Sequence, residues 1–250
     1  MRLSSRPDVL RLEARHDVEG LVQALGYKAD TGIQQAALDA LMNIGESAVP
    51  VLIIALARPN LHPYAADALL KLSVVSIQPL INVLKVDDRQ EMRSAACRIL
   101  ENIGMFAIEP LVITLVHRKT EVRESARSVL VAIGALAVEP LANLLRDINR
   151  PDYARLEAVT ALHKIGGSGA LSVLLTAAQT DPSEAVREHA SALLGHPHIV
   201  KSPGISASPQ PAVTRTRGLS RRFQEEGDND VPYTPENLSG QQQPSTQTQL

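Results

Sequence analysis

Hydrophobic residues in this chain recur at helical spacing within short segments that resemble one another. Six segments place apolar residues three and four positions apart around a central alanine: IQQAALDAL (33–41), HPYAADALL (62–70), MRSAACRIL (92–100), VRESARSVL (122–130), ARLEAVTAL (154–162) and VREHASALL (186–194). The central alanines Ala37, Ala66, Ala96, Ala126, Ala158 and Ala190 are separated by 29, 30, 30, 32 and 32 residues. Apolar spacing of this kind predicts amphipathic helices, and its regular return predicts a repeat architecture.

A second apolar segment follows each of the first five helices after a short break. The breaks are Ile44-Gly45, Leu72-Ser73, Ile103-Gly104, Ile133-Gly134 and Ile165-Gly166, and glycine can take the left-handed conformation that ends a helix. Five or six residues after the break come Pro50, Pro79, Pro110 and Pro140, with Ala170 in the corresponding place of the fifth repeat. Proline is tolerated in the first turn of a helix, so these residues predict the start of a second helix.

These signals predict an all-α fold, an α-α superhelix of about five to six helical hairpins. The expected units are repeats near 33–57, 62–86, 92–117, 122–147 and 154–178 and a terminal helix at 183–194, with a capping helix at Asp17 to Leu25. One hairpin cannot bury its apolar face alone, whereas stacked hairpins share a continuous core. We therefore expect residues 1–195 to form a solenoid, followed at 196–250 by a disordered tail rich in Pro, Ser and Gln.

Composition narrows the functional classes. The 25 basic and 27 acidic residues give a net charge of −2, which favours neither nucleic acid nor anionic lipid as a partner of the whole chain. The single cysteine, Cys97, excludes an internal disulfide and fits a reducing compartment. The N-terminal residues lack the apolar run of a secretory signal, and the longest apolar stretch, 49–57, is too short to span a membrane. A cytoplasmic protein is expected.

The two-helix unit resembles a known family. The pattern V-R-x-x-A-x-x-x-L, then I-G, then A-V-x-P-L, best matched by residues 122–145, is similar to the short HEAT-like repeat of the phycobilin lyase type. The resemblance covers about residues 17–195, with Ser73 in place of Gly in the second repeat and Ala170 in place of Pro in the fifth. It implies bilin lyase subunits, deoxyhypusine hydroxylase, glycosylases of related architecture and many bacterial proteins as relatives, and fold does not select among them.

Candidate chemistry is sparse, and no catalytic residue, cofactor site or metal site is assigned. The resemblance to deoxyhypusine hydroxylase implies repeated His-Glu pairs as iron ligands, but none of the seven histidines is followed by Glu, and Glu188-His189 has the reverse order. Cys97 has no residue pattern that would activate a thiol. The run Gly166-Gly167-Ser168-Gly169 lacks the Lys-Ser/Thr of a phosphate loop.

Four arginines occupy the same place in successive first helices: Arg93, Arg123, Arg155 and Arg187. Each follows an acid within three residues, namely Glu91, Glu121, Asp152 and Glu184. This ladder predicts either a row of ion pairs between repeats, each worth about 0 to 1 kcal/mol when exposed, or a basic stripe for an acidic partner segment.

The outward face of the second helices carries large aliphatic side chains where polar ones were expected. Counting from the marker proline, positions three, six and seven share a face, and we predict partner binding by Ile53, Leu56, Ile113, Val116, His117 and Arg146. Burial of these aliphatic residues in the solenoid core is the competing interpretation.

The favoured function is a non-catalytic interaction or scaffold module that presents a groove to a protein or peptide of unknown identity, in an unknown oligomeric state. The alternatives are a lyase-like or chaperone-like subunit resembling bilin lyases and an iron hydroxylase, which the missing His-Glu pairs disfavour. In the tail, the segment RGLSRRF (217–223) is a candidate recognition motif, with a solvated linker as the alternative.

Overall fold

A computed structural model describes residues 6–195 of the chain, and the predicted tail lies outside these residues. Within them the chain forms thirteen α-helices and three short 3-10 helices and no strand, which confirms the all-α class. The α-helices are α1 Val9–Ala14, α2 Val18–Leu25, α3 Thr31–Ile44, α4 Val49–Ala55, α5 His62–Leu72, α6 Val74–Val86, α7 Gln90–Ile103, α8 Ile108–Thr114, α9 Thr120–Ile133, α10 Val138–Arg146, α11 Asp152–Ile165, α12 Gly167–Thr180 and α13 Glu184–Leu193. The 3-10 helices Gly45–Ala48, Gly104–Ala107 and Gly134–Ala137 precede α4, α8 and α10.

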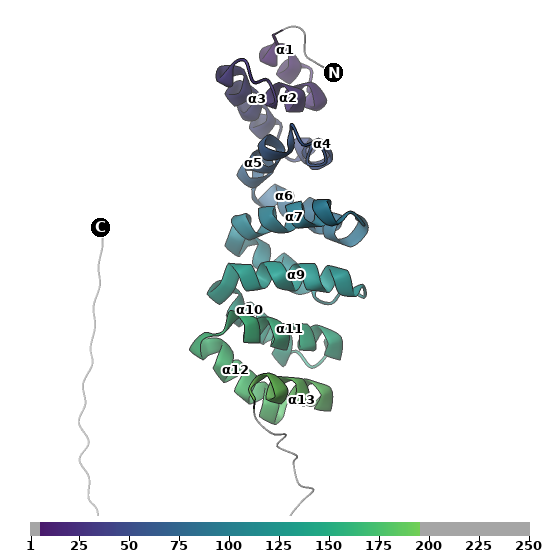
Figure 1. The fold of residues 1–250 in the computed structure, drawn as a ribbon, viewed down its shortest axis with the longest axis vertical. Helices are drawn as coiled ribbons and strands as arrows, with labels where there is room; N and C mark the ends of the chain where they lie inside the picture. Colours follow the sequence, from purple (N-terminus) through teal and green to yellow (C-terminus); the bar gives the residue numbers. More distant parts are fainter. Residues whose placement is uncertain (1–5, 196–250) are drawn as a thin grey trace, which may run out of the picture. The chain divides into compact units, whose positions relative to one another are not determined.

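The helices pair into hairpins that stack in chain order. The first helices α3, α5, α7, α9 and α11 are each followed by a second helix, and α13 closes the series. In Figure 1 the first helices α7, α9, α11 and α13 lie one below another, each packed on the next. Contacts are made almost entirely between neighbouring hairpins, as expected for a repeat protein in which each unit is stabilised by its neighbours.

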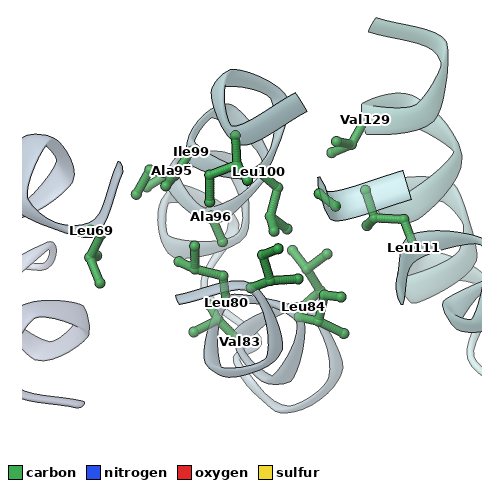
Figure 2. Packing of buried hydrophobic residues seen from close by; sticks show 14 of the residues in the cluster. Leu69, Leu80, Val83, Leu84, Ala95, Ala96, Ile99, Leu100, Leu111 and Val129 are labelled. Atoms are coloured by element: carbon green, nitrogen blue, oxygen red, sulfur yellow. The ribbon is translucent and has the colours of Figure 1, made fainter. Parts of the chain in front are cut away.

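The core runs between the two layers of helices. Figure 2 shows Leu80 and Leu84 of α6 facing Ala96 and Leu100 of α7, and all four are buried. The central alanine is buried in every repeat except the second, where Ala66 is partly exposed and the preceding Ala65 is buried instead. A small side chain at this place lets the helices approach closely, which explains the conserved spacing of the six segments.

The predicted helix stops are confirmed by backbone geometry. Gly45, Gly104, Gly134 and Gly166 have φ between 67° and 78°, a region that side chains with a Cβ rarely adopt. Ser73 takes the corresponding place in the second repeat with φ 46°. The serine is therefore held in a glycine conformation by the repeat around it.

The predicted helix starts are confirmed at Pro50, Pro110 and Pro140, and the one predicted at Pro79 is wrong. Pro50 is the second residue of α4, and Pro110 and Pro140 are the third residues of α8 and α10. In the second repeat α6 begins at Val74, so Pro79 lies inside it.

A buried small residue after the break gives the true alignment of the second helices. It lies three positions after the glycine or serine in the first four hairpins and four positions after Gly166 in the fifth: Ala48, Ser76, Ala107, Ala137 and Ala170. By this alignment Pro50 comes one position earlier than Pro110. Ala170 is not the proline equivalent, as the sequence suggested, because Val173 stands at that place.

At the N-terminus the expected helix is present as α2, and Asp17 caps it through a hydrogen bond of 2.9 Å from the Gly20 amide to its Oδ1. The short helix α1 before it was not predicted. Asp8 caps α1 by accepting from the Arg11 amide at 3.2 Å. Both helices pack on α3 and cover the first hairpin.

Two stretches, Thr31–Ala55 and Thr120–Arg146, are long and apolar enough to be compared with membrane-spanning helices. Each contains a glycine with positive φ, Gly45 or Gly134, followed by a 3-10 turn. In both stretches the backbone reverses at this point, so each forms the two arms of one hairpin rather than one continuous helix.

Candidate partner-binding surface

The second helices α8, α10 and α12 stack on one another, and their exposed side chains form what we call the second-helix face. Two hollows of similar size lie on this face, one between α8 and α10 and the other between α10 and α12. The exposed side chains of Asn143 and Arg146 on α10 separate them. The repeat thus produces two neighbouring recesses one hairpin apart.

The α8–α10 hollow has a volume of about 230 Å³. Its apolar part consists of buried Val112 and Leu144, half-buried Val116 and Ile113, whose side chain is 66% exposed. Asp147 and Arg150 border it with an ion pair of 3.0 Å.

Backbone hydrogen bonding from Asn149, together with Arg150, lowers the pKa of the Asp147 carboxyl. Asp147 is therefore an anion at the rim of an apolar recess at neutral pH.

The α10–α12 hollow has a volume of about 260 Å³ and is lined by Leu145, Ile148, Val173 and Ala177, with polar groups at its edge. Ile148 is as exposed as Ile113. Arg146 borders this hollow and donates 3.0 Å hydrogen bonds to Glu139 Oε1 and Asn143 Oδ1, which hold the guanidinium on the outward side of α10.

The structure separates the predicted partner-binding residues into two groups. Ile113 and Val116 line the α8–α10 hollow, and Arg146 borders the α10–α12 hollow. Leu56 was wrongly placed on the outward face, because it is only 4% exposed and corresponds to the buried Leu115. The register shift at Pro50 is the cause. Ile54, 61% exposed, is the true equivalent of Ile113, and the predicted Ile53 is half-buried against the core.

His117 has a local role. Its Nδ1 accepts a hydrogen bond of 3.2 Å from the Lys119 amide, and its backbone carbonyl accepts from Arg123. It is not part of the lining of the α8–α10 hollow. The histidine fixes the loop between α8 and α9, so its predicted contact with a partner has no support from the geometry.

Three of the four ladder arginines hold loops in place. Arg93 donates to the carbonyl of Asp87 at 3.1 Å, Arg123 to that of His117 at 3.1 Å and Arg187 to that of Asp181 at 2.6 Å. Each acceptor lies six residues earlier, where the preceding second helix has just ended. We call this interaction the loop clamp, and it satisfies carbonyls that a helix end leaves unpaired.

Arg155 departs from the loop clamp and binds carboxylate side chains instead. Its guanidinium is 3% exposed and donates to both carboxylate oxygens of Asp181, at 2.7 and 2.9 Å, and to Asp152 at 2.6 Å. Ser183 donates to the other oxygen of Asp152 at 2.6 Å. Among the predicted pairs of ladder arginines with preceding acids, Asp152–Arg155 forms, whereas none involving Glu91, Glu121 or Glu184 is present in residues 6–195. A free basic stripe is therefore excluded at Arg155.

A buried charge cluster between the fourth and fifth repeats was missed by sequence reasoning. Glu157 of α11 accepts from Arg123 Nε at 3.2 Å and from Arg127, and the Tyr153 ring lies 5.0 Å from the Arg123 guanidinium. Tyr153 also donates to the Val116 carbonyl at 3.0 Å. The signal was available in the sequence, since Ala36, Ala95 and Ser125 hold the place of Glu157 in the first, third and fourth repeats.

The remaining candidate groups are not arranged for catalysis in residues 6–195. Burial raises the pKa of the Cys97 thiol to about 11, despite a hydrogen bond with Ser125 that acts in the opposite direction. His189 Nε2 lies 2.8 Å from the Thr160 hydroxyl, between two repeats. No group of three or more His, Cys, Asp or Glu residues in the described part of the chain could hold a metal ion.

Comparisons with known proteins assign no family to this chain. No family model matches the sequence, and no curated protein matches it. Among solved structures, the chain is similar to human deoxyhypusine hydroxylase in complex with glycerol, with 21% identity over 75% of each chain and a TM-score of 0.36. It is similar to a designed armadillo repeat protein, with 22% identity over 71% of this chain and 98% of that one and a TM-score of 0.27.

A third likeness is to the complex of CpcE and CpcF of phycocyanin lyase from Nostoc sp., with 18% identity over 72% of this chain and 99% of that one and a TM-score of 0.29. Likenesses at this level concern the helical-repeat fold and assign neither an activity nor a partner. The stacked hairpins themselves describe this chain as a helical-repeat protein.

Proposed function

We propose that this chain is a non-catalytic binding module that holds a segment of another protein on the second-helix face of α8, α10 and α12. The observation that carries the proposal is the pair of hollows one repeat apart, each lined by apolar side chains and bordered by charged ones. Recesses of this kind accept apolar side chains of a partner, while polar groups at the rim fix its orientation.

The exposed aliphatic residues support this role. Ile113 and Ile148 lie beside the two hollows and contribute little to the folded core, since most of each side chain faces solvent. Burying an isoleucine side chain is worth roughly 1.5 to 3 kcal/mol. Two or three such contacts supply a substantial part of the about 8 kcal/mol that corresponds to a micromolar dissociation constant, before ordering costs are subtracted.

The experiment is affinity purification of the full-length protein from its native host, with mass spectrometry of the eluate, followed by titration of the recovered partner against purified variants. Ile113→Asp places a charge beside the α8–α10 hollow and is expected to weaken binding at least about tenfold, or about 1.4 kcal/mol. Leu10→Asp is the matched control, because Leu10 is exposed on α1 far along the chain from the hollows.

The outcomes separate the alternatives. If Ile113→Asp weakened binding of the partner no more than Leu10→Asp does, the second-helix face would be excluded as the binding surface. An absorption spectrum of the same eluate tests the lyase-like alternative, because a bound pigment or a phycobiliprotein partner would replace the proposal. Metal analysis tests the hydroxylase-like alternative in the same sample.

A further inference from the structure

A second apolar surface lies at the turns inside the hairpins. In the first four hairpins, two residues face solvent between the glycine or serine that ends the first helix and the buried small residue. In the three central hairpins these positions hold large apolar side chains that are 40 to 64% exposed: Val74 and Val75, Met105 and Phe106, and Leu136 beside Ala135. We call the five large side chains the turn edge.

The fold does not require these apolar residues. The first hairpin has the same 3-10 turn as the third and fourth, yet it carries Glu46 and Ser47 at the corresponding positions. In each turn the small residue that follows these exposed positions packs into the core, and it is buried in every hairpin. Because neighbouring stacked helices are about 8 to 10 Å apart, the turn edge extends over roughly 20 Å.

Exposed carboxylates lie close in sequence to the turn edge, and one of them, Glu109, also lines the α8–α10 hollow. Glu46, Glu109 and Glu139 are exposed in the first turns after three of the breaks, where they also favour the helix macrodipole. Glu139 is paired with Arg146, whereas Glu46 and Glu109 form no ion pair within residues 6–195. The nearby Lys71 is already paired with Asp67 at 3.3 Å.

These charges restrict what can cover the edge. A second copy of the chain, docked edge to edge, would bring glutamates against glutamates, and like charges across an interface disfavour association. An anionic membrane surface would be repelled in the same way. A segment that combines apolar side chains with lysine or arginine would meet both the apolar strip and its acidic surroundings.

We infer that the turn edge is a docking surface for a basic, apolar segment of another protein. This surface is separate from the second-helix face, since none of its five residues lines either hollow. The turn edge therefore gives the solenoid a second binding surface, and the inference does not depend on the proposed function of the second-helix face.

The test is fluorescence anisotropy with full-length protein and a labelled 18-residue peptide in which leucine and lysine form an amphipathic helix, compared with the same peptide carrying glutamate for lysine. The expected result is binding of the lysine peptide alone. The double variant Phe106→Ser/Leu136→Ser should bind it at least about tenfold more weakly, because two apolar contacts are lost.

Three controls make the result specific. Ile148→Ser removes an equally exposed isoleucine beside the α10–α12 hollow and should leave peptide binding unchanged, whatever its effect on the proposed partner. Glu46→Gln should weaken binding and reduce its salt dependence. Circular dichroism verifies that each variant is folded.

Equal affinity for the glutamate peptide, or unchanged affinity in Phe106→Ser/Leu136→Ser, would overturn the inference. So would sedimentation showing a dimer of the wild-type chain that the same double variant dissociates, because the edge would then be a self-association surface.

Discussion

Glu157 in α11 accepts a hydrogen bond from Arg127 in α9, thirty positions earlier in the chain, and both side chains are largely buried between the fourth and fifth repeats. Removing one partner of a buried ion pair leaves the other charge uncompensated. Glu157→Ala would leave Arg123 and Arg127 without their shared carboxylate. We expect a loss of about 3 kcal/mol in the free energy of unfolding, measured by urea denaturation followed by circular dichroism.

Glu124→Ala in α9, the helix that carries Arg127, is the matched control, because Glu124 is exposed and its removal should change stability by less than about 0.5 kcal/mol. A loss in Glu157→Ala no larger than in the control would show that the cluster does not stabilise the interface. Since repeat arrays are stabilised by nearest-neighbour interfaces, hydrogen exchange should locate the loosened region in α9 and α11.

Ser73 is expected to be a site of stabilising substitution. Its φ of 46° lies where the other repeats use glycine. A side chain in such a conformation costs of order 1 to 3 kcal/mol, which exceeds the roughly 0.5 to 1 kcal/mol of extra entropy that glycine loses on folding. Ser73→Gly should therefore stabilise the protein by about 1 kcal/mol and raise its melting temperature.

Ser47→Gly in the first hairpin is the comparison, since Ser47 has ordinary negative φ and its replacement by glycine should be neutral or destabilising. If both substitutions lowered the melting temperature, strain at Ser73 would not be the reason.

Cys97 is expected to react slowly in the folded protein. Burial raises the pKa of its thiol to about 11 from the value of 9.0 for a free thiol, and only the thiolate is nucleophilic. At pH 8 the folded chain should contain about 100-fold less thiolate than the unfolded chain, so alkylation by iodoacetamide should be slower by at least that factor.

The rate is measured with and without urea at the same pH. Ser125→Ala should slow labelling further, because the Ser125 hydrogen bond lowers the pKa of the thiol. Faster labelling in that variant would contradict this assignment.

The contact between α11 and the start of α13 should depend on pH. Hydrogen bonding from Ser183 and then Arg155 lowers the pKa of the Asp152 carboxyl below its ordinary value. A carboxyl with a lowered folded pKa stabilises the protein above its unfolded pKa of about 3.9, and this contribution is lost as the pH falls toward the folded value. Asp152→Asn should therefore lower the melting temperature at pH 7 and have little effect near pH 3.

The comparison is a series of melting temperatures of the wild-type protein and Asp152→Asn between pH 3 and pH 7. A difference that grows as the pH falls would have the wrong sign for this carboxyl and would exclude it as the cause.

The fold could be predicted because helix ends are local features. The glycine stops and the small alanines depend on residues close in sequence, and the structure places them as expected except in the second repeat, where Ala65 is buried in place of Ala66. The register of α4 and α12 could not be predicted from the proline marker, because Pro50 and Pro140 are both acceptable in an opening turn although they differ by one position. The buried Ala48 and Ala170 carry the register instead.

The binding surface could be predicted only in part for a related reason. Whether an aliphatic side chain faces solvent depends on the exact helix rotation. A shift of one residue put the half-buried Ile53 in the place of the exposed Ile54 and the buried Leu56 on the outward face. The loop clamps and the Glu157 cluster depend on where long side chains reach in three dimensions. An alignment of the repeats identifies Glu157 as an unusual residue at its position, but it does not identify the arginines that pair with it.

The spacing of the two hollows determines which ligands can fill both of them along the second-helix face. Successive hollows are set by stacked helices about 8 to 10 Å apart. A polyproline II segment turns the same side toward a surface every third residue, which is about 9 Å further along its axis. An α-helix needs two turns, or about seven residues, to present the same side again at a comparable distance. A ligand with apolar residues at every third position would fill one hollow after another, so the period of the repeat is also a periodicity to seek in the sequence of its partner.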